Sequence, residues 1–323
     1  MTIMNYIVFD LEWNQSPDGK KYTNSRIPFE IIEIGAIKLN KKREIVDQFH
    51  TLIKPQVYHW IHENIHEVIH VDYKELENGM LFPQAVTAFL KWCGEKPSFF
   101  TWGTQDLTEL QRNMRYYDLL SLLPGPITYY NVQKLASICF EDGLTRRALE
   151  YTVDQLKIEK GQDFHRALAD AYYTAEIVRR MDVESILNNS SIDVFQNPKT
   201  KKEELYISHP GYDKYVSREF PCKEKLMKDH EVVSTRCPVC HQAAKRKIRW
   251  FVNSSKIYYS VAYCPQHGYL EGKIRIRKTE EEQYFAIKFL RLIDEKEAEE
   301  MREKRESLRC KKRKRKKSEK QIG

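Results

Sequence analysis

NYIVFDLEW, residues 5–13, is an apolar and β-branched stretch that two acidic residues interrupt. This composition over this length favours a β-strand. Because side chains alternate along a strand, Asp10 and Glu12 point to the same face. Two carboxylates among apolar neighbours are costly to bury unless a cation joins them. The stretch therefore predicts a divalent-cation site or, if the strand lies at the edge of a sheet, two solvated acids.

Two later segments add acidic residues of the same kind. In TWGTQD, residues 101–106, Asp106 follows a short predicted strand and begins a helix. In HRALAD, residues 165–170, His165 opens the last helix of this region and Asp170 follows five residues later. Each segment taken alone also fits an ordinary helix start, where acidic side chains are favoured by the helix dipole. Strands come first and are then followed by alternating helices and strands, which indicates an α/β fold with a mixed sheet flanked by helices.

Together the three segments resemble the DEDD-type exonuclease superfamily, in its DEDDh branch, over about residues 5–181. IIEIGAIKL (31–39) and YNVQKLASICF (130–140) fit the same pattern, and TWGTQD is similar to a segment of the ERI-like RNA-trimming exonucleases. The resemblance implies an RNase H-like fold. It also implies a 3′–5′ exonuclease that releases nucleoside 5′-monophosphates from single-stranded ends, with RNA favoured.

The resemblance also implies a role for each motif residue. Two Mg²⁺ or Mn²⁺ ions would be held by Asp10, Glu12, Asp106 and Asp170. His165 would act as general base and take a proton from the attacking water. Trp13, next to the first motif, would stack on the terminal base or pack against the sheet edge.

Charge divides the chain into two halves. Residues 1–190 carry 21 Lys and Arg against 26 Asp and Glu, a net −5, so the remaining residues carry 33 against 20, a net +13. An acidic catalytic half does not attract polyanions by its net charge, whereas the basic half can. This asymmetry predicts a catalytic part and a nucleic-acid-binding part.

The basic half contains a metal-ligand pattern. Cys237 and Cys240 form one pair and Cys264 and His267 another, separated by 23 residues. Such spacing is typical of a structural zinc ion in a small zinc ribbon. The intervening residues mix cations with aromatic rings, a combination that suits backbone contacts and base stacking. The predicted substrate contacts there are Lys245, Arg246, Lys247 and Arg249.

We expect four parts in the chain. These are an exonuclease domain (1–187), a linker (188–230), a zinc-ribbon-like domain (231–278), and a charged helix with a disordered basic tail (279–323). In the first domain we expect strands over 5–13, 29–39 and 44–53 and a helix over 58–70. In the linker, Pro198, Pro210, Gly211 and Pro221 interrupt the pattern, which leaves room for only local structure, and the charged helix is expected over 279–309. Seven cysteines without a disulfide-scaffold pattern, and no apolar run of membrane length, predict a cytoplasmic protein without a membrane partner. Two alternative functions stay open. One is a DNA-directed exonuclease of the proofreading or repair kind, and the other is a nucleic-acid-binding adaptor with a vestigial exonuclease fold.

Overall fold

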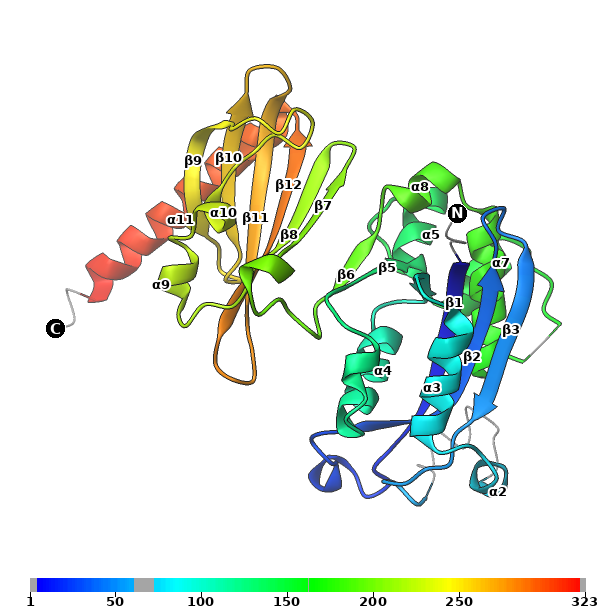
Figure 1. Ribbon diagram of the computed structural model, residues 1–323. Helices are drawn as coiled ribbons and strands as arrows, with labels where there is room; N and C mark the ends of the chain where they lie inside the picture. Colours follow the sequence, from blue (N-terminus) through cyan, green and yellow to red (C-terminus); the bar gives the residue numbers. More distant parts are fainter. Residues whose placement is uncertain (1–4, 61–72, 162, 320–323) are drawn as a thin grey trace. The chain divides into compact units, whose positions relative to one another are not determined.

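The computed structural model describes residues 5–60, 73–161 and 163–319. The chain divides into two compact units, Met1–Gln196 and Asn197–Gly323 (Figure 1). The boundary lies inside the segment that was expected to be a linker. Because Asp193 falls on the N-terminal side of it, the net charges of the two units become −6 (21 against 27) and +14 (33 against 19).

The N-terminal unit is built on a six-stranded mixed sheet of order β3-β2-β1-β4-β5-β6. β1 pairs antiparallel with β2 and parallel with β4. β1 is therefore a central strand, which excludes the edge-strand interpretation of Asp10 and Glu12. The strands are β1 (Asn5–Gln15), β2 (Phe29–Leu39), β3 (Ile45–Leu52), β4 (Pro97–Thr101), β5 (Ile127–Asn131) and β6 (Ser191–Asp193).

Helices flank this sheet on both faces (Figure 1). One face of β1, with Ile7 and Phe9, packs in a core with α3 and α4, and the other face, beginning with Val8, packs in a core with α5, α6 and α7. The α/β fold with a flanked mixed sheet is thus confirmed. The helices are α2 (Tyr73–Glu77), α3 (Phe82–Cys93), α4 (Gln105–Tyr116), α5 (Val132–Phe140), α6 (Leu149–Gln155), α7 (Ala167–Arg180) and α8 (Val183–Leu187).

The C-terminal unit is built on a second six-stranded sheet, of order β7-β8-β12-β11-β10-β9, in which every pairing is antiparallel. Two short helices share a core with one face, and the long helix α11 packs on the other. The elements are β7 (Leu205–His209), β8 (Tyr212–Val216), α9 (Lys223–Leu226), α10 (His230–Val233), β9 (Lys245–Val252), β10 (Tyr258–Cys264), β11 (Gly268–Lys278), β12 (Tyr284–Ile293) and α11 (Glu295–Glu319).

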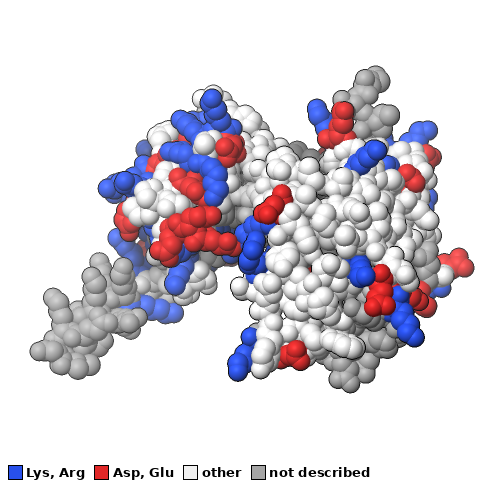
Figure 2. Space-filling model, turned by 60° about the horizontal axis from the view of Figure 1, so that its bottom comes forward, with Lys and Arg blue, Asp and Glu red and all other residues white. Residues whose placement is uncertain are grey.

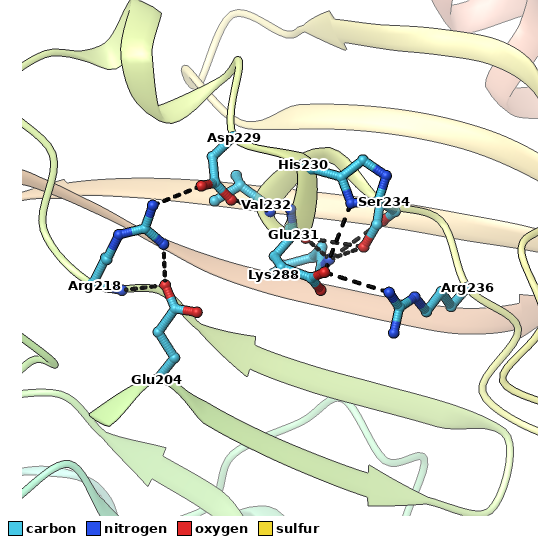
Figure 3. A network of polar contacts seen from close by, with 9 residues as sticks. All are labelled: Glu204, Arg218, Asp229, His230, Glu231, Val232, Ser234, Arg236 and Lys288. Atoms are coloured by element: carbon cyan, nitrogen blue, oxygen red, sulfur yellow. Dashed lines mark hydrogen bonds and ion pairs between the residues drawn. The ribbon is translucent and has the colours of Figure 1, made fainter. Parts of the chain in front are cut away.

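A buried lysine ties one of the short helices to this sheet (Figure 3). Lys288 on β12 is only 1% exposed, and burial lowers its pKa to about 8. Its Nζ donates to the carbonyl of Glu231 and, at 2.9 Å, to the hydroxyl of Ser234. The ammonium group therefore holds the end of α10, and the turn that leads to the first cysteine pair, against the sheet.

The segment expected to be a linker, 188–230, is instead structured. Pro210 and Gly211 were interpreted as interruptions, but they form the turn of the β7–β8 hairpin, where Gly211 has a φ of 81°. A left-handed backbone at a hairpin turn favours glycine. The break in the pattern was thus a turn within a sheet.

The charged helix predicted over 279–309 is wrong in its first half. Residues 284–293 form β12, which pairs on both sides, with β11 and with β8. Charged residues on both sides of this apolar run gave it the composition of a charged helix, although it forms a strand paired on both edges. The basic run 311–317 was expected to be disordered but continues α11 as helix to Glu319, in keeping with the good helix propensity of Lys and Arg.

Two further sequence-based expectations concern helices. The helix predicted over 58–70 lies mostly outside the described residues. Among the helices of the described residues, none has both the length and the apolar character needed to cross a membrane.

Candidate active site

The acidic motif residues come together at one end of the first sheet. Asp10 and Glu12 project from β1, and Asp170 lies in the first turns of α7. One carboxylate oxygen from each of these three residues lies within 4.8 Å of the others. Asp106, near the start of α4, lines the same cavity of about 430 Å³ as these three residues. The fold therefore brings the acidic residues of three distant sequence motifs to one cavity.

A glycine on the neighbouring strand makes this meeting possible. Gly35 on β2 pairs in register with Asp10. A Cβ atom at Gly35 would lie 2.1 Å from the backbone nitrogen of Leu168 in α7, so only glycine lets the helix approach this closely. Because α7 packs directly on β2, Asp170, two residues after Leu168, comes close to Asp10.

The cluster is electrostatically strained without a cation. Burial, followed by repulsion from Asp106 and Glu12, raises the pKa of Asp10 well above its usual range. Burial and the charge of Asp170 raise the pKa of Glu12 to about 8. Burial raises the pKa of Asp106 to about 7, against the effect of its backbone N–H bonds. All three carboxyls therefore retain protons that they would lose in water, unless positive charge is supplied.

The oxygen atoms of this cluster also suit a hard cation. Burial raises the pKa of Asp170 to about 6, and the nearby His165 opposes that rise. Oδ1 of Asp170 is buried and has no hydrogen-bond partner within the described residues. An unsatisfied buried oxygen beside two more carboxylates fits a divalent cation such as Mg²⁺ or Mn²⁺. The donors present thus fit the expected cofactor.

His165 stands at the approach to the cluster rather than inside it. It is exposed, has a left-handed backbone with a φ of 64°, and is not among the residues that line the carboxylate cavity. The next residue, Arg166, is fixed by Glu33 on β2, with 3.2 Å between Nε and Oε2. His165 is thus carried on a turn that an ion pair holds to the sheet.

Aromatic and amide side chains complete the cavity. Trp13 lines it and also packs on Phe29, with ring centroids 5.9 Å apart, so both interpretations of Trp13 have structural support. The sequence reasoning did not identify Trp102, Gln133 and Leu149 as wall residues. Two of them could have been found from the sequence, because Trp102 lies in the TWGTQD segment and Gln133 in the YNVQKLASICF segment. Nε1 of Trp102 is buried and has no partner in the described part of the chain.

The second predicted metal site also assembles. Each of Cys237, Cys240, Cys264 and His267 offers a ligand atom, and these atoms lie within 4.8 Å of one another. Sγ of Cys237 is 3.5 Å from Nδ1 of His267, and the sulfur atoms of Cys240 and Cys264 are 3.7 Å apart. A tetrahedral zinc with ordinary bond lengths separates its sulfur and nitrogen ligands by about 3.5 to 3.8 Å. The Cys₃His group therefore fits a four-coordinate zinc ion.

The elements around this group differ from a free-standing zinc ribbon. The first pair lies in a turn closed by a bridge between Arg236 and Ala243, and the second lies in the β10–β11 turn, where Gly268 has a φ of 83°. Both turns belong to the larger six-stranded unit. The cluster thus joins the segment before β9 to the β10–β11 hairpin.

The predicted substrate contacts on β9 are all exposed, namely Lys245, Arg246, Lys247 and Arg249. Lys247 lies over the ring of Tyr263, 5.3 Å from its centroid. In Figure 2, Lys and Arg side chains interspersed with acidic ones cover much of the C-terminal unit. The N-terminal unit shows mostly uncharged residues on the face drawn.

A mixed sheet of this order, with four acidic residues lining one cavity and a histidine five residues before the last of them, has the arrangement expected of a DEDDh-type exonuclease. The model of the Exonuclease family matches residues 7–178, more than half of the chain. The chain belongs to that family, and it is a phosphodiester hydrolase.

Solved structures with a similar fold include several nucleases. The nuclease domain of 3′hExo, a DEDDh family member bound to rAMP, is 19% identical; the match covers 55% of this chain and 92% of that one, with a TM-score of 0.48. The cell-death related nuclease 4 is 17% identical over 58% of this chain and 65% of that one, with a TM-score of 0.46. E. coli exonuclease I in complex with a dA16 oligonucleotide is 14% identical; the match covers 57% of this chain and 42% of that one, with a TM-score of 0.44. A search of curated protein sequences found no match.

Proposed function

We propose that this exonuclease acts on single-stranded nucleic acid, favours RNA, and releases nucleoside 5′-monophosphates from the 3′ end. The observation that carries the proposal is the cluster of Asp10, Glu12 and Asp170 within 4.8 Å, in one cavity with Asp106. The cavity is open enough for a chain end, since it measures about 430 Å³ and has tryptophan in its walls.

We assign the four carboxylates to two Mg²⁺ or Mn²⁺ ions, held by Asp10, Glu12, Asp106 and Asp170. When bound, two such cations supply positive charge to the attacking and leaving oxygens of a phosphodiester. The carboxylates fix that positive charge at the end of the sheet, and the chain's own contribution is their placement by β1, α4 and α7.

His165 is the proposed proton acceptor. An imidazole accepts a proton from a water molecule near neutral pH, which makes it suited to this step. Its exposed position on the turn before α7 leaves it accessible to that water, and its influence on the pKa of Asp170 shows that it lies near the cluster. Arg166 and Glu33 hold the turn in place.

Trp13 and Trp102 are the proposed contacts of the terminal nucleotide. Both line the cavity, and an aromatic face stacks on any base, so they provide binding that tolerates sequence. The preference for RNA is supported by the TWGTQD segment, because its similarity to ERI-like RNA-trimming exonucleases falls on residues that form the cavity wall.

The C-terminal unit is proposed to bind substrate. Its net charge of +14 (33 basic against 19 acidic residues) favours the binding of polyanions. The proposed substrate contacts in this unit are the exposed side chains of Lys245, Arg246, Lys247 and Arg249 on β9. We assign Cys237, Cys240, Cys264 and His267 to a structural Zn²⁺ ion, because four protein ligands leave no open position. The cytoplasmic location stays a prediction from the sequence.

The proposal is tested with 5′-labelled single-stranded RNA and DNA of equal sequence, incubated with the full chain and Mn²⁺. We expect both to shorten from the 3′ end, RNA faster, with nucleoside 5′-monophosphates identified by chromatography. Faster degradation of DNA would favour the DNA-directed alternative. Absence of any shortening, in conditions where the oligonucleotide still binds, would favour the adaptor.

A further inference from the structure

A groove of about 520 Å³ lies in the C-terminal unit, where the edge strand β9 runs beside α11 (Figure 1). Its walls come from the end of β9, including Arg249, Phe251 and Val252, and from the middle of α11, with Arg305 and Leu308. The volume is that of an ordinary small-molecule site, about 300 to 1,000 Å³. The groove uses residues of one unit only and shares none with the carboxylate cavity.

The helix side of the groove follows from the spacing of residues along α11. Ala298 and Met301 are buried against the sheet, and Arg305 and Leu308 continue the same helical face at intervals of four and three residues. The face that is apolar at the start of the helix thus becomes half-buried and basic where it passes the end of β9.

The strand side offers an apolar wall. Phe251 is half-buried and packs in the core between the sheet and α11, whereas Val252, at the end of β9, is 47% exposed. Trp250 also lines the groove, but it packs in the core on the opposite face of the sheet, where its Nε1 donates to the carbonyl of Val233 at 3.0 Å and a Cβ at Gly272 would lie 2.6 Å from the indole. The end of β9 is therefore held by packing on both faces of the sheet.

The arginines of the groove are not held in ion pairs within the described residues. Arg249, Arg305 and Arg309 form no ion pair or hydrogen bond with an acidic side chain there, whereas Arg291 on the same sheet is paired with both Glu271 and Glu297. Guanidinium groups that are free to bind, beside apolar walls, match a ligand that carries negative charge and a flat ring. A nucleotide unit offers both, since its phosphate pairs with arginine and its base packs on the apolar walls.

We propose that the groove between β9 and α11 is a binding site for one or two nucleotides of single-stranded nucleic acid, separate from the carboxylate cavity. This inference rests on the proposed function, because it supplies the substrate contact that the C-terminal unit would make. Arg249, Arg305 and Arg309 take the phosphates, and Phe251 and Leu308 take the base. Lys245, Arg246 and Lys247 extend the cationic surface along β9.

The first test measures how the affinity for fluorescent single-stranded oligonucleotides depends on salt. The full zinc-containing chain is titrated into a U-rich RNA and a T-rich DNA, with Ca²⁺ in place of Mg²⁺ or Mn²⁺ and with the oligonucleotide shown to stay intact. The double variant Arg305→Ala with Arg309→Ala should bind at least about tenfold more weakly. Its log–log salt slope should be smaller by about 1.4, the value for two lost phosphate contacts on a single strand.

Two control variants distinguish the loss of groove contacts from the loss of positive charge in general. Lys201→Ala with Lys202→Ala removes the same charge from exposed residues of the same unit and should leave the slope unchanged. Arg305→Lys with Arg309→Lys should keep most of the slope. An unchanged slope in the double alanine variant, or an equal loss in the Lys201 and Lys202 variant, would overturn the site.

The second test locates the base. An oligonucleotide with 5-iodouracil, irradiated in the complex, should cross-link to residues 250–256, a single tryptic peptide, and Leu308→Ala should reduce that yield. Cross-links found only elsewhere would overturn the proposal, as would a dimer that Leu308→Ala dissociates, since the groove would then bind a second copy.

Hydrolysis of a p-nitrophenyl ester of thymidine 5′-monophosphate with Mn²⁺ keeps the two proposals distinct. This single nucleotide cannot occupy both sites, so the groove variants should hydrolyse it normally. A wild-type chain that fails to hydrolyse it contradicts the exonuclease chemistry, whereas normal hydrolysis with an unchanged salt slope contradicts the groove alone.

Discussion

The guanidinium group of Arg166 donates to both carboxylate oxygens of Glu33, at 3.2 to 3.3 Å, and Arg166 directly follows His165. Glu33 is 1% exposed and pairs in register with Glu12 on β1. Burial alone would raise the pKa of Glu33, but hydrogen bonds from His50 and Arg166 lower it below its usual value. A carboxylate with a lowered pKa on the sheet therefore anchors the turn that carries the proposed base.

Arg166→Ala should act on catalysis through His165. Loss of the ion pair frees a turn whose backbone is left-handed at His165, so the imidazole loses its placement. Because small misplacements of a catalytic group cost up to about 100-fold, we expect kcat to fall by roughly tenfold or more, with KM changed by less than about threefold. Steady-state kinetics on a single-stranded oligonucleotide, together with the pH profile, measure this effect.

His50→Ala is the matched control, since it removes another bond to the same Glu33 carboxylate, 2.7 Å long, without touching the His165 turn. It should leave kcat within about twofold. Equal losses in the two variants would mean that Glu33 itself, and not the position of His165, controls the rate.

Gly35→Ala should disrupt the cluster by displacing α7. The added methyl group would lie 2.1 Å from backbone atoms that cannot move independently of the helix. We expect a loss of about 1 to 3 kcal/mol in the free energy of unfolding and weaker binding of Mn²⁺, because Asp170 moves away from Asp10. Gly161→Ala, where no atom lies within 4 Å of the new Cβ, is the control and should change neither. Normal Mn²⁺ affinity in Gly35→Ala would contradict this account of the site.

Stability should depend on pH in a way that cations reverse. Burial raises the pKa of Asp170 to about 6, of Asp106 to about 7 and of Glu12 to about 8, so the folded chain retains protons that the unfolded chain releases above about pH 4. The folded state then binds more protons, and without added Mg²⁺ its stability falls as pH rises from about 4 to 8.

Thermal unfolding of zinc-containing protein tests this dependence. Mg²⁺ should raise Tm more at about pH 8 than at about pH 5.5, because cations and protons compete for the same carboxylates. Asp170→Asn should reduce both the pH dependence and the Mg²⁺ effect. A Mg²⁺ shift of equal size at the two pH values would argue against binding at these groups.

The Cys₃His group should hold one zinc ion per chain. Cys240→Ser removes a ligand from atoms spaced about as zinc requires, so metal analysis should show loss of the zinc, and the C-terminal unit should unfold at lower temperature. Cys310→Ser replaces an exposed cysteine outside the group and should keep full zinc content. Equal zinc content in the two variants would contradict the assignment.

Features that depend on a local sequence pattern were mostly predicted from the sequence. The bounds of β2 and the common face of Asp10 and Glu12 follow from local strand pattern, whereas Asp106 and Asp170 were assigned to the same site through the resemblance of their segments. The Arg166–Glu33 pair was not predictable, because its members are 133 residues apart and no local period links them. Gly35 gave no local signal, since its function depends on a helix that crosses it.

The C-terminal unit shows the same limit of local patterns. Pro210 and Gly211 were interpreted as a break because a hairpin turn and an irregular loop share their residues. β12 was concealed by the charged residues around it, and its identity as a strand depends on pairing with β8 and β11. Pairing with distant strands is a tertiary effect, and the strand propensity of individual residues does not predict it.

The most direct test of the carboxylate cluster follows a 5′-labelled single-stranded RNA over time with Mn²⁺, for the wild-type chain, Asp10→Asn and the groove variant Leu308→Ala. Our account predicts a ladder that shortens from the 3′ end with wild type, a loss of at least about 1,000-fold in rate with Asp10→Asn, and an intact though weaker-binding activity with Leu308→Ala. Undiminished degradation by Asp10→Asn, or early release of the labelled 5′ nucleotide, would contradict it.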